Sequence, residues 1–308
     1  MRIVFFGTPE FAVPSLQSLL DEQAQVVGVV TQPDRPRGRS RSVLIPPPIK
    51  TLAASRGLTV FQPERPAGDL FLAALRRLEP DLGVVVAYGH ILKPEILAVP
   101  RLGMINVHAS LLPALRGAAP IPWSILEGHP RTGVTIMQME AGLDSGPILM
   151  QRDTPITPWE TGGSLTERLA AIGAEALEEA IPLLRTGQLA ARPQDHAAAT
   201  FAPKIDRTAT RIRWEETADL VARRIRAFDP EPGAWSTLDG AGDVKLFGAR
   251  PVPAEGTPGT IVATAPELVV ACGSGAVAME EVQPAGKKRM TAEAWARGRG
   301  AKAGQRFG

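Results

Sequence analysis

Three polar residues in the middle of the chain have the types and spacing needed to act on a carbonyl group. Asn106 and His108 lie two residues apart in the otherwise apolar run 104–108, just before a proline-containing loop. Alternate residues of a strand point to the same face, so we expect these two side chains to lie side by side. An amide donor next to an imidazole is suited to stabilising a negatively charged oxygen. The pair is equally compatible with a structural histidine and a turn-forming asparagine.

Asp144 is the third candidate, in the turn 142–146 between two strand-like runs. An aspartate flanked by glycines is usually a turn residue. If this turn approaches His108, the carboxylate instead orients the imidazole and favours its charged form. The sequence leaves both interpretations open, because it does not show whether the two segments meet.

The composition is that of an ordinary globular protein. The chain has 308 residues, of which 44% are hydrophobic and 21% charged, and at roughly 150 residues per domain this predicts two domains. One cysteine, Cys272, excludes an internal disulfide and a cysteine zinc site, and the four histidines form no helical pair for a metal. Without a long apolar run or a signal-peptide pattern, we expect a cytoplasmic protein with no metal and no membrane partner.

The elements that must position these residues alternate along the first two-thirds of the chain. Strands are expected at 3–7, 26–30, 58–61, 82–86, 104–108, 133–139 and 148–153, and helices at 12–20, 49–55, 70–78, 120–128 and 165–184. This alternation predicts an α/β fold with a doubly wound, Rossmann-like sheet, whose ligands bind at the carboxyl ends of the strands. The first turn, 7–10, lacks the dinucleotide-binding glycine pattern, which disfavours a nicotinamide dehydrogenase.

The remainder of the chain has a different pattern. We place a first domain at 1–189, a polar linker at 190–209 and a second domain at 210–308. After a helix at 218–228, the second domain has about five short strand-like runs, which predict a small all-β barrel of the OB-like type. The end of the chain, 296–308, is rich in glycine, arginine and alanine, and we expect it to be disordered.

Basic residues concentrate in three stretches although the net charge is only +2. The stretches are 31–50, 203–226 and 287–308, and they leave the rest of the chain acidic. Each stretch alone is typical of a solvated surface. Three together favour local binding of a polyanion such as a nucleic acid.

Several segments carry a resemblance to a known family. They are 105–113, 116–121, 132–139 and 143–146, supported by 8–12, 31–36, 226–230 and 283–288. In combination they are highly specific, they run through nearly the whole chain, and they are similar to the folate-dependent formyltransferases. Arg213 departs from the family pattern, which more often has an acidic or amide residue there.

The resemblance implies an activity. It implies transfer of the formyl group of 10-formyltetrahydrofolate to the α-amino group of methionyl initiator tRNA, for translation initiation. The amine attacks directly, without a covalent enzyme intermediate. The implied roles are that Asn106 and His108 stabilise the oxygen of the tetrahedral intermediate, and that Asp144 sets the charge of His108 and assists proton transfer.

The resemblance also implies two binding sites. The folate cosubstrate is expected to bind the segment Ser110, Leu111, Leu112 and Pro113, with Val86 and Tyr88 among the pocket walls. The tRNA is expected to bind the basic loop 34–48 and the second domain through Arg35, Arg37, Arg39, Arg41, Lys204, Lys287 and Lys288. Nothing in these sites requires more than a monomer.

Two other functions remain open at this point. The first is a related folate enzyme acting on a small amine, such as a sugar nucleotide or a purine precursor; the basic second domain argues against it. The second is a catalytically silent RNA-binding protein. The presence of Asn106, His108 and Asp144 together argues against that, because a silent protein has no chemical need for them.

Overall fold

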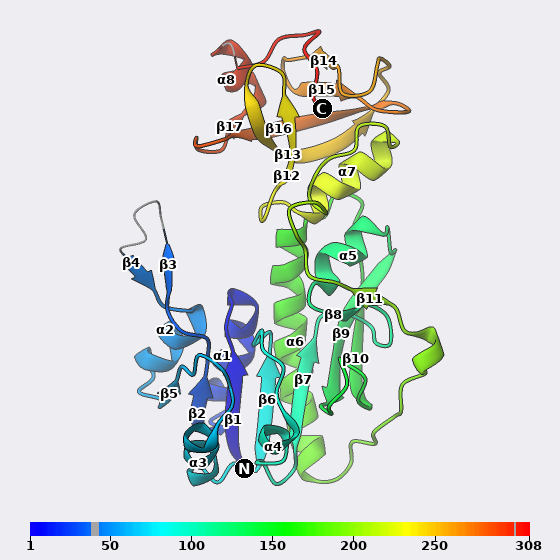
Figure 1. Cartoon of the computed structure of the whole chain (residues 1–308). Helices are drawn as coiled ribbons and strands as arrows, with labels where there is room; N and C mark the ends of the chain where they lie inside the picture. The colour runs from blue at the N-terminus through cyan, green and yellow to red at the C-terminus, as the bar shows by residue number, and fades with distance from the viewer. Residues whose placement is uncertain (38–42, 299) are drawn as a thin grey trace. The chain divides into compact units, whose positions relative to one another are not determined.

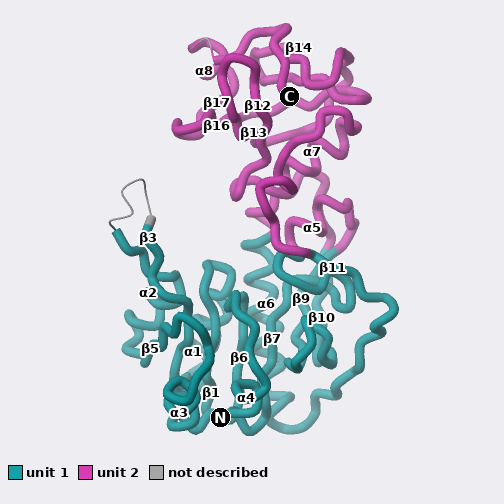
Figure 2. Tube along the Cα trace, viewed as in Figure 1, with its two compact units in different colours: residues 1–120, 132–154, 166–202 teal, residues 121–131, 155–165, 203–308 magenta. Residues whose placement is uncertain are grey.

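The computed structural model describes residues 1–37, 43–298 and 300–308. They form two compact units that interleave along the chain (Figure 2). The first unit comprises 1–120, 132–154 and 166–202, and the second comprises 121–131, 155–165 and 203–308. The division expected from the sequence, with borders at 189 and 209, did not include this interleaving.

A seven-stranded sheet forms the centre of the first unit (Figure 1). In spatial order its strands are β10 (Ile148–Pro155), β9 (Arg131–Gln138), β7 (Met104–His108), β6 (Leu82–Val86), β1 (Arg2–Gly7), β2 (Gln25–Val30) and β5 (Val60–Phe61). The strands from β7 to β5 pair in parallel, whereas β9 runs antiparallel to β7. The Rossmann-like α/β domain predicted from the sequence is confirmed.

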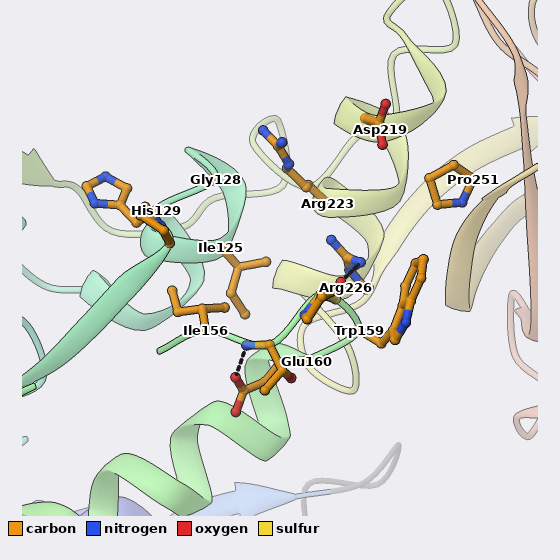
Figure 3. Close-up of a pocket in the computed structure, with 13 residues that line it drawn as sticks. Ile125, Gly128, His129, Ile156, Trp159, Glu160, Asp219, Arg223, Arg226 and Pro251 are labelled. Atoms are coloured by element: carbon orange, nitrogen blue, oxygen red, sulfur yellow. Dashed lines mark hydrogen bonds between the residues drawn. The ribbon is translucent and has the colours of Figure 1, made fainter. Parts of the chain in front are cut away.

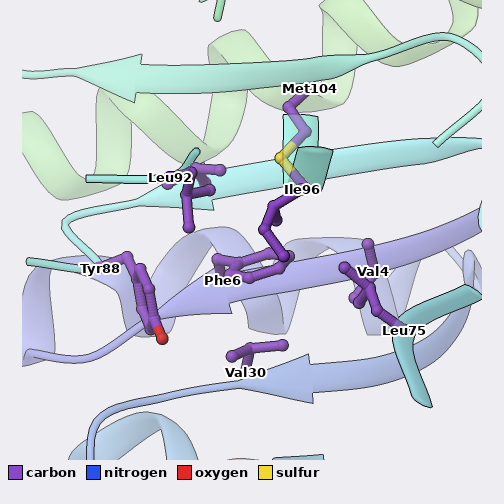
Figure 4. Packing of buried hydrophobic residues seen from close by; sticks show 9 residues of the cluster. Val4, Phe6, Val30, Leu75, Tyr88, Leu92, Ile96 and Met104 are labelled. Atoms are coloured by element: carbon purple, nitrogen blue, oxygen red, sulfur yellow. The ribbon is translucent and has the colours of Figure 1, made fainter. Parts of the chain in front are cut away.

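Helices pack on both faces of this sheet. The first unit contains α1 (Val13–Asp21), α2 (Pro48–Ser55), α3 (Asp69–Arg77), α4 (Pro94–Leu97) and most of α6 (Gly162–Arg185), whereas nearly all of α5 (Pro120–Leu126) and all of α7 (Ala218–Ala227) belong to the second unit. On one face, Phe6 and Met104 pack in a buried cluster with Ile96 of α4 (Figure 4). On the other face, Val107 approaches α6, where a Cβ on Gly173 would lie 2.9 Å from its Cγ1.

The strand alternation therefore places the candidate catalytic side chains. Asn106 and His108 alternate with Val107 along β7. Because side chains alternate between the faces of a sheet, both lie on the face opposite α6, as Met104 does.

The basic loop contains secondary structure that the sequence analysis did not expect. Strand β3 (Arg35–Arg37) pairs antiparallel with β4 (Val43–Ile45) in a two-stranded ribbon. Arg39 and Arg41, both assigned to tRNA binding, lie outside the described residues.

A six-stranded antiparallel sheet forms most of the second unit. In spatial order its strands are β12 (Ala234–Leu238), β13 (Gly242–Val252), β16 (Ala276–Pro284), β15 (Leu268–Ala271) and β14 (Ile261–Ala263). A sixth strand, β17 (Met290–Thr291), pairs with β16. Helix α8 (Ala292–Arg297) follows. The predicted separate β domain at the end of the chain is confirmed.

Residues 300–308, at the end of the chain, are ordered, which corrects the expectation of disorder for them. The backbone N–H of Phe307 donates to Gly259 just before β14, and that of Gly308 donates to Thr237 in β12, both at 2.9 Å. The ring of Phe307 is 1% exposed. Composition misled here, because one buried aromatic residue and paired backbone groups are enough to hold a segment poor in apolar residues.

Neither a membrane-spanning helix nor a metal-binding cluster occurs in the part of the chain that the structure describes. No helix in the described part of the chain is long and apolar enough to cross a membrane. Within the same residues, no group of three or more His, Cys, Asp or Glu side chains is arranged to hold a metal ion.

Candidate active site

His108 lies buried at the carboxyl end of β7, and its two ring nitrogens have different neighbours. Nε2 lies 3.0 Å from the backbone oxygen of Leu115. A carbonyl oxygen can only accept, so Nε2 carries a proton and Nδ1 is the nitrogen left for chemistry. Nδ1 lies 3.7 Å from Oδ2 of Asp144. The fold thus brings together two of the three predicted catalytic residues.

Asn106 is available to a ligand. Its side chain is partly exposed on the same face of β7 as His108. Its carboxamide makes no hydrogen bond with any residue that the structure describes. A free amide donor near an imidazole is the arrangement expected for an oxygen that becomes negative during a reaction.

The turn that carries Asp144 combines both interpretations left open by the sequence. Asp144 has φ 46°, in the left-handed region that turns the chain, and this costs roughly 1–2 kcal/mol for a residue other than glycine. Its Oδ2 accepts a 2.8 Å hydrogen bond from the backbone N–H of Gly117. Leu115, which binds His108, has φ 58°. Asp144 and Leu115, the two residues that flank the His108 ring, therefore both have strained backbone conformations. Contacts with neighbouring residues must stabilise these conformations.

The predicted folate-binding segment has two buried and two accessible side chains. Ser110 and Leu112 are 1% and 3% exposed, whereas Leu111 and Pro113 are partly exposed. Oγ1 of Thr135 organises the loop, because it donates to the oxygen of Ser110 at 2.7 Å and accepts from the nitrogen of Leu112 at 3.1 Å. A ligand can reach Leu111 and Pro113 directly, while the buried pair shapes the loop from within.

Val86 and Tyr88 need a correction, because their side chains belong to the core. Val86 is 0% and Tyr88 2% exposed, and the Tyr88 ring packs edge-on against Phe6 at 5.4 Å (Figure 4). Burial raises the pKa of Tyr88 to about 12. The Tyr88 hydroxyl has no hydrogen-bond partner within the described structure. Neither side chain is placed to line a pocket, so a contact with folate from this turn would come from its backbone.

The predicted basic residues of the second unit are exposed. Lys204, Lys287 and Lys288 all lie at its surface. In the first unit, Arg35 is exposed on β3, where its guanidinium bonds the side chain of Gln32. Arg37 contributes its backbone to the same strand.

The second unit adds a basic and aromatic row that was not among the RNA-binding residues expected from the sequence. Arg211, Trp235 and Lys245 occupy laterally paired positions in neighbouring strands. The guanidinium carbons of Arg207 and Arg211 lie 4.0 and 5.6 Å from the centre of the Trp235 ring. The signal in the sequence was the alternation of basic residues before an aromatic strand, but only the strand pairing aligns them.

A hollow of about 310 Å³ in the second unit is a separate feature (Figure 3). Its charged lining consists of Arg223 and Arg226 from α7, balanced by Asp219 and Glu160. Arg226 donates to the backbone oxygen of Pro158. None of the predicted catalytic or folate-binding residues lines this hollow, so it is not the candidate active site.

Comparisons with known proteins agree with the motifs. A family model described as formyl transferase matches residues 1–181, and one described as formyl transferase, C-terminal domain, matches residues 204–300. The methionyl-tRNA formyltransferase of Geotalea uraniireducens is 46% identical over 95% of this chain and 93% of its own. That of Methylococcus capsulatus is 48% identical over 95% of this chain and 95% of its own.

The chain belongs to the methionyl-tRNA formyltransferase family. This confirms the family resemblance drawn from the sequence motifs.

Solved structures share the fold at lower identity. HypX from Aquifex aeolicus, crystallised in complex with tetrahydrofolic acid, matches 97% of this chain and 47% of its own with a TM-score of 0.67 at 21% identity. This chain therefore spans about half of HypX. The N-formyltransferase from Helicobacter canadensis, in complex with folinic acid and dTDP-3-aminofucose, has a TM-score of 0.67 at 16% identity, over 94% of this chain and 99% of its own. These likenesses establish the fold.

Proposed function

We propose that this chain transfers the formyl group of 10-formyltetrahydrofolate to the α-amino group of methionyl initiator tRNA, giving N-formylmethionyl-tRNA for translation initiation. Relatives named methionyl-tRNA formyltransferase are 43–48% identical to this chain over about 95% of its length. The observation that carries the proposal is the pair His108 and Asp144, 3.7 Å apart on the side of β7 where Asn106 is free.

The chemistry is direct attack of the amine on the formyl carbon. The new carbon–nitrogen bond forms to the α-amino nitrogen, the formyl oxygen becomes negative, and the bond to N10 of the folate then breaks. Asn106 and the imidazolium form of His108, through Nδ1–H, donate to the negative oxygen. Losing one such donor typically costs about 3–4 kcal/mol of transition-state stabilisation.

Asp144 acts on the proton balance of this reaction. Its Oδ2 lies 3.7 Å from Nδ1 of His108, which is longer than a hydrogen bond, so the carboxylate is not occupied by the imidazole. A proton released by the attacking amine can be held by the carboxylate and returned to N10 of the leaving tetrahydrofolate. No nucleophile on the enzyme takes part.

The folate cosubstrate is proposed to bind at the loop after β7. Leu111 and Pro113 offer apolar contacts, and the exposed residue Ala87 lies at the end of the neighbouring strand β6. This agrees with the rule that ligands of open α/β sheets bind at the carboxyl ends of the strands.

The RNA partner is proposed to bind through phosphate contacts. In the second unit, Lys204, Lys287, Lys288 and Arg211 are exposed cations, and Lys245, paired with Trp235, is a partly exposed one. In the first unit, Arg35 is an exposed cation. Basic side chains that neutralise phosphates give an affinity that falls steeply with salt.

We also propose the finer architecture. We assign catalysis to 1–189 and RNA binding to 210–308, a domain whose sheet is closed as an OB-like barrel. The pairing of the last residues with both β12 and the segment before β14 supports closure. We propose that the enzyme acts as a monomer in the cytoplasm, where charged tRNA is available.

Single-turnover formyl transfer tests the function. The donor is 10-formyltetrahydrofolate, and the acceptors are methionyl initiator tRNA, free methionine and glycinamide ribonucleotide. Transfer to the charged tRNA alone is the expected result. Transfer only to a small amine would contradict the proposed substrate but leave the catalytic assignment of Asn106, His108 and Asp144 standing. Binding of tRNA without any formyl transfer would contradict the enzymatic function and indicate an RNA-binding protein.

A further inference from the structure

One buried amide side chain lies in the segment that the sequence indicated as a linker. Gln194 is 6% exposed, although the residues on either side of it are exposed. Its Oε1 accepts from Nε and Nη2 of Arg116, at 3.1 and 2.6 Å. Its Nε2 donates to the backbone oxygens of Asp144 and Gly146, at 2.8 and 2.7 Å.

This arrangement permits only one orientation of the Gln194 amide. An arginine side chain can only donate, and a backbone carbonyl can only accept. Exchanging the oxygen and nitrogen of the amide would therefore oppose donor to donor and acceptor to acceptor. Gln194 thus joins Arg116 to the Asp144 turn with every hydrogen bond defined.

The same segment also holds the other partner of His108. Oγ1 of Thr200 accepts from the backbone N–H of Leu115 at 2.9 Å. The oxygen of Thr200 accepts from the N–H of Arg116, also at 2.9 Å. Leu115 is the residue whose carbonyl binds Nε2 of His108. Both groups that flank the imidazole are therefore tied to residues 194–200.

Arg116 makes the loss of Gln194 costly. Its side chain is buried at 5% exposure, and its partners in the described structure are Gln194 and Nδ1 of His196, at 3.1 Å from Nη2. None of these is a carboxylate. Without Gln194, Nε of this buried cation loses its acceptor and Nη2 keeps only His196. A buried donor left unpaired is unfavourable, so the surrounding backbone would move to satisfy it.

We propose that Gln194 is a positioning residue for formyl transfer: it holds the strained Asp144 turn against Arg116 and so sets the distance from Asp144 to His108. The inference rests on the proposed function. Gln194 touches none of the reacting atoms and acts through Asp144. A misplacement of about 1 Å in an active site can lower the rate about 100-fold.

The test replaces the amide by a side chain of similar length that cannot form these hydrogen bonds. Gln194→Met is compared with Gln188→Met, which alters an exposed glutamine bonded to Thr186. Steady-state formyl transfer is measured with methionyl initiator tRNA and 10-formyltetrahydrofolate each varied in turn while the other is saturating. We expect Gln194→Met to lower kcat about 10- to 100-fold with KM values changed less than about threefold. Gln188→Met should change neither.

A double-mutant cycle separates positioning from general structural support. If Gln194 acts through Asp144, Gln194→Met should cause almost no further loss in an Asp144→Ala background. A full additive loss in that background would overturn the proposal, as would wild-type kcat in Gln194→Met alone.

Amide hydrogen exchange gives a readout that does not depend on activity. The N–H of Gly117 is bonded to Oδ2 of Asp144, so its exchange should become faster in Gln194→Met while that of Val134 in β9 stays unchanged. Unchanged exchange at Gly117 would overturn the proposal. If the wild-type protein transfers no formyl group, the proposed function fails, and Gly117 exchange still decides whether Gln194 positions Asp144.

Discussion

The backbone N–H of Gly117 donates a 2.8 Å hydrogen bond to Oδ2 of Asp144, the same oxygen that lies 3.7 Å from Nδ1 of His108. One oxygen is thus oriented by the backbone and faces the imidazole. The orientation of the Asp144 carboxylate therefore depends on a backbone N–H. A side-chain substitution cannot delete this donor and can only displace it by shifting the backbone. This contact gives the carboxylate of a partly exposed turn residue a defined orientation.

Removing the side chain of His108 or of Asp144 should abolish most of the turnover. His108→Ala and Asp144→Ala are each expected to lower kcat about 10²- to 10³-fold, because a donor to the negative oxygen or the acceptor of the amine proton is lost. Asn106→Ala should have a loss of similar size. His129→Ala is the control, since His129 pairs with Glu127 and lies outside the site. Near-wild-type turnover in His108→Ala or Asp144→Ala would contradict the assignment.

Gly117→Ala should damage the site through a close contact. Gly117 has φ 120°, and a Cβ there would lie 2.7 Å from the backbone oxygen of Ala202. We expect kcat to fall at least about 10-fold as the Gly117 amide moves away from Asp144. Gly187→Ala is a matched control, because Gly187 has φ 71° with no atom within 4 Å of its Cβ position. It should lose about 1 kcal/mol of stability and keep its activity.

Tyr88→Phe should stabilise the protein without weakening folate binding. The variant removes a buried hydroxyl that has no partner in the described structure. The expected gain is about 1 kcal/mol in the free energy of unfolding, measured with urea. The KM for 10-formyltetrahydrofolate should not change. A raised KM would show that the hydroxyl reaches the cosubstrate after all.

Cys272 should resist thiol reagents in the folded protein. It is 3% exposed, and burial raises its pKa to about 12. An aromatic disulfide reagent at pH 8 should react slowly until denaturant is added. Above about pH 8.5 the unfolded thiol loses its proton while the folded thiol keeps it. The contribution of this group to stability is therefore complete below that pH and is lost as the pH rises toward 12. Rapid labelling of the native protein would contradict the buried placement.

Lys287 and the basic and aromatic row Arg211, Trp235 and Lys245 should contribute to RNA affinity in a salt-dependent way. Lys287→Ala and Lys245→Ala are each expected to reduce the slope of log K against log salt by about 0.7–0.9, the value for one phosphate contact. Trp235→Ala should weaken binding as well, because its ring orients Arg207 and Arg211. Lys93→Ala, on an exposed lysine beside Glu95, is the control. Equal slopes for the Lys245 variant and the wild type would remove Lys245 from the interface.

Local pattern determined much of the fold and half of the site. Strand β7 has the bounds expected from its apolar run, because a short β-branched and apolar segment between turn residues has few alternatives. The two-residue period then places Asn106 and His108 on one face whatever the rest of the chain does. The basic stretches also follow from the sequence, since charge is a local property.

Tertiary structure alone decided the rest. The approach of Asp144 to His108 depends on the Gly117 amide, on the left-handed turn and on Gln194, which come from separate segments. The burial of Tyr88 and the pairing of the chain end also arise from distant partners. Hydrophobic periodicity reports which face of an element is buried, but it carries no information on which backbone groups meet across the fold. Those hydrogen bonds form only when the segments are packed, and they set the active-site distances.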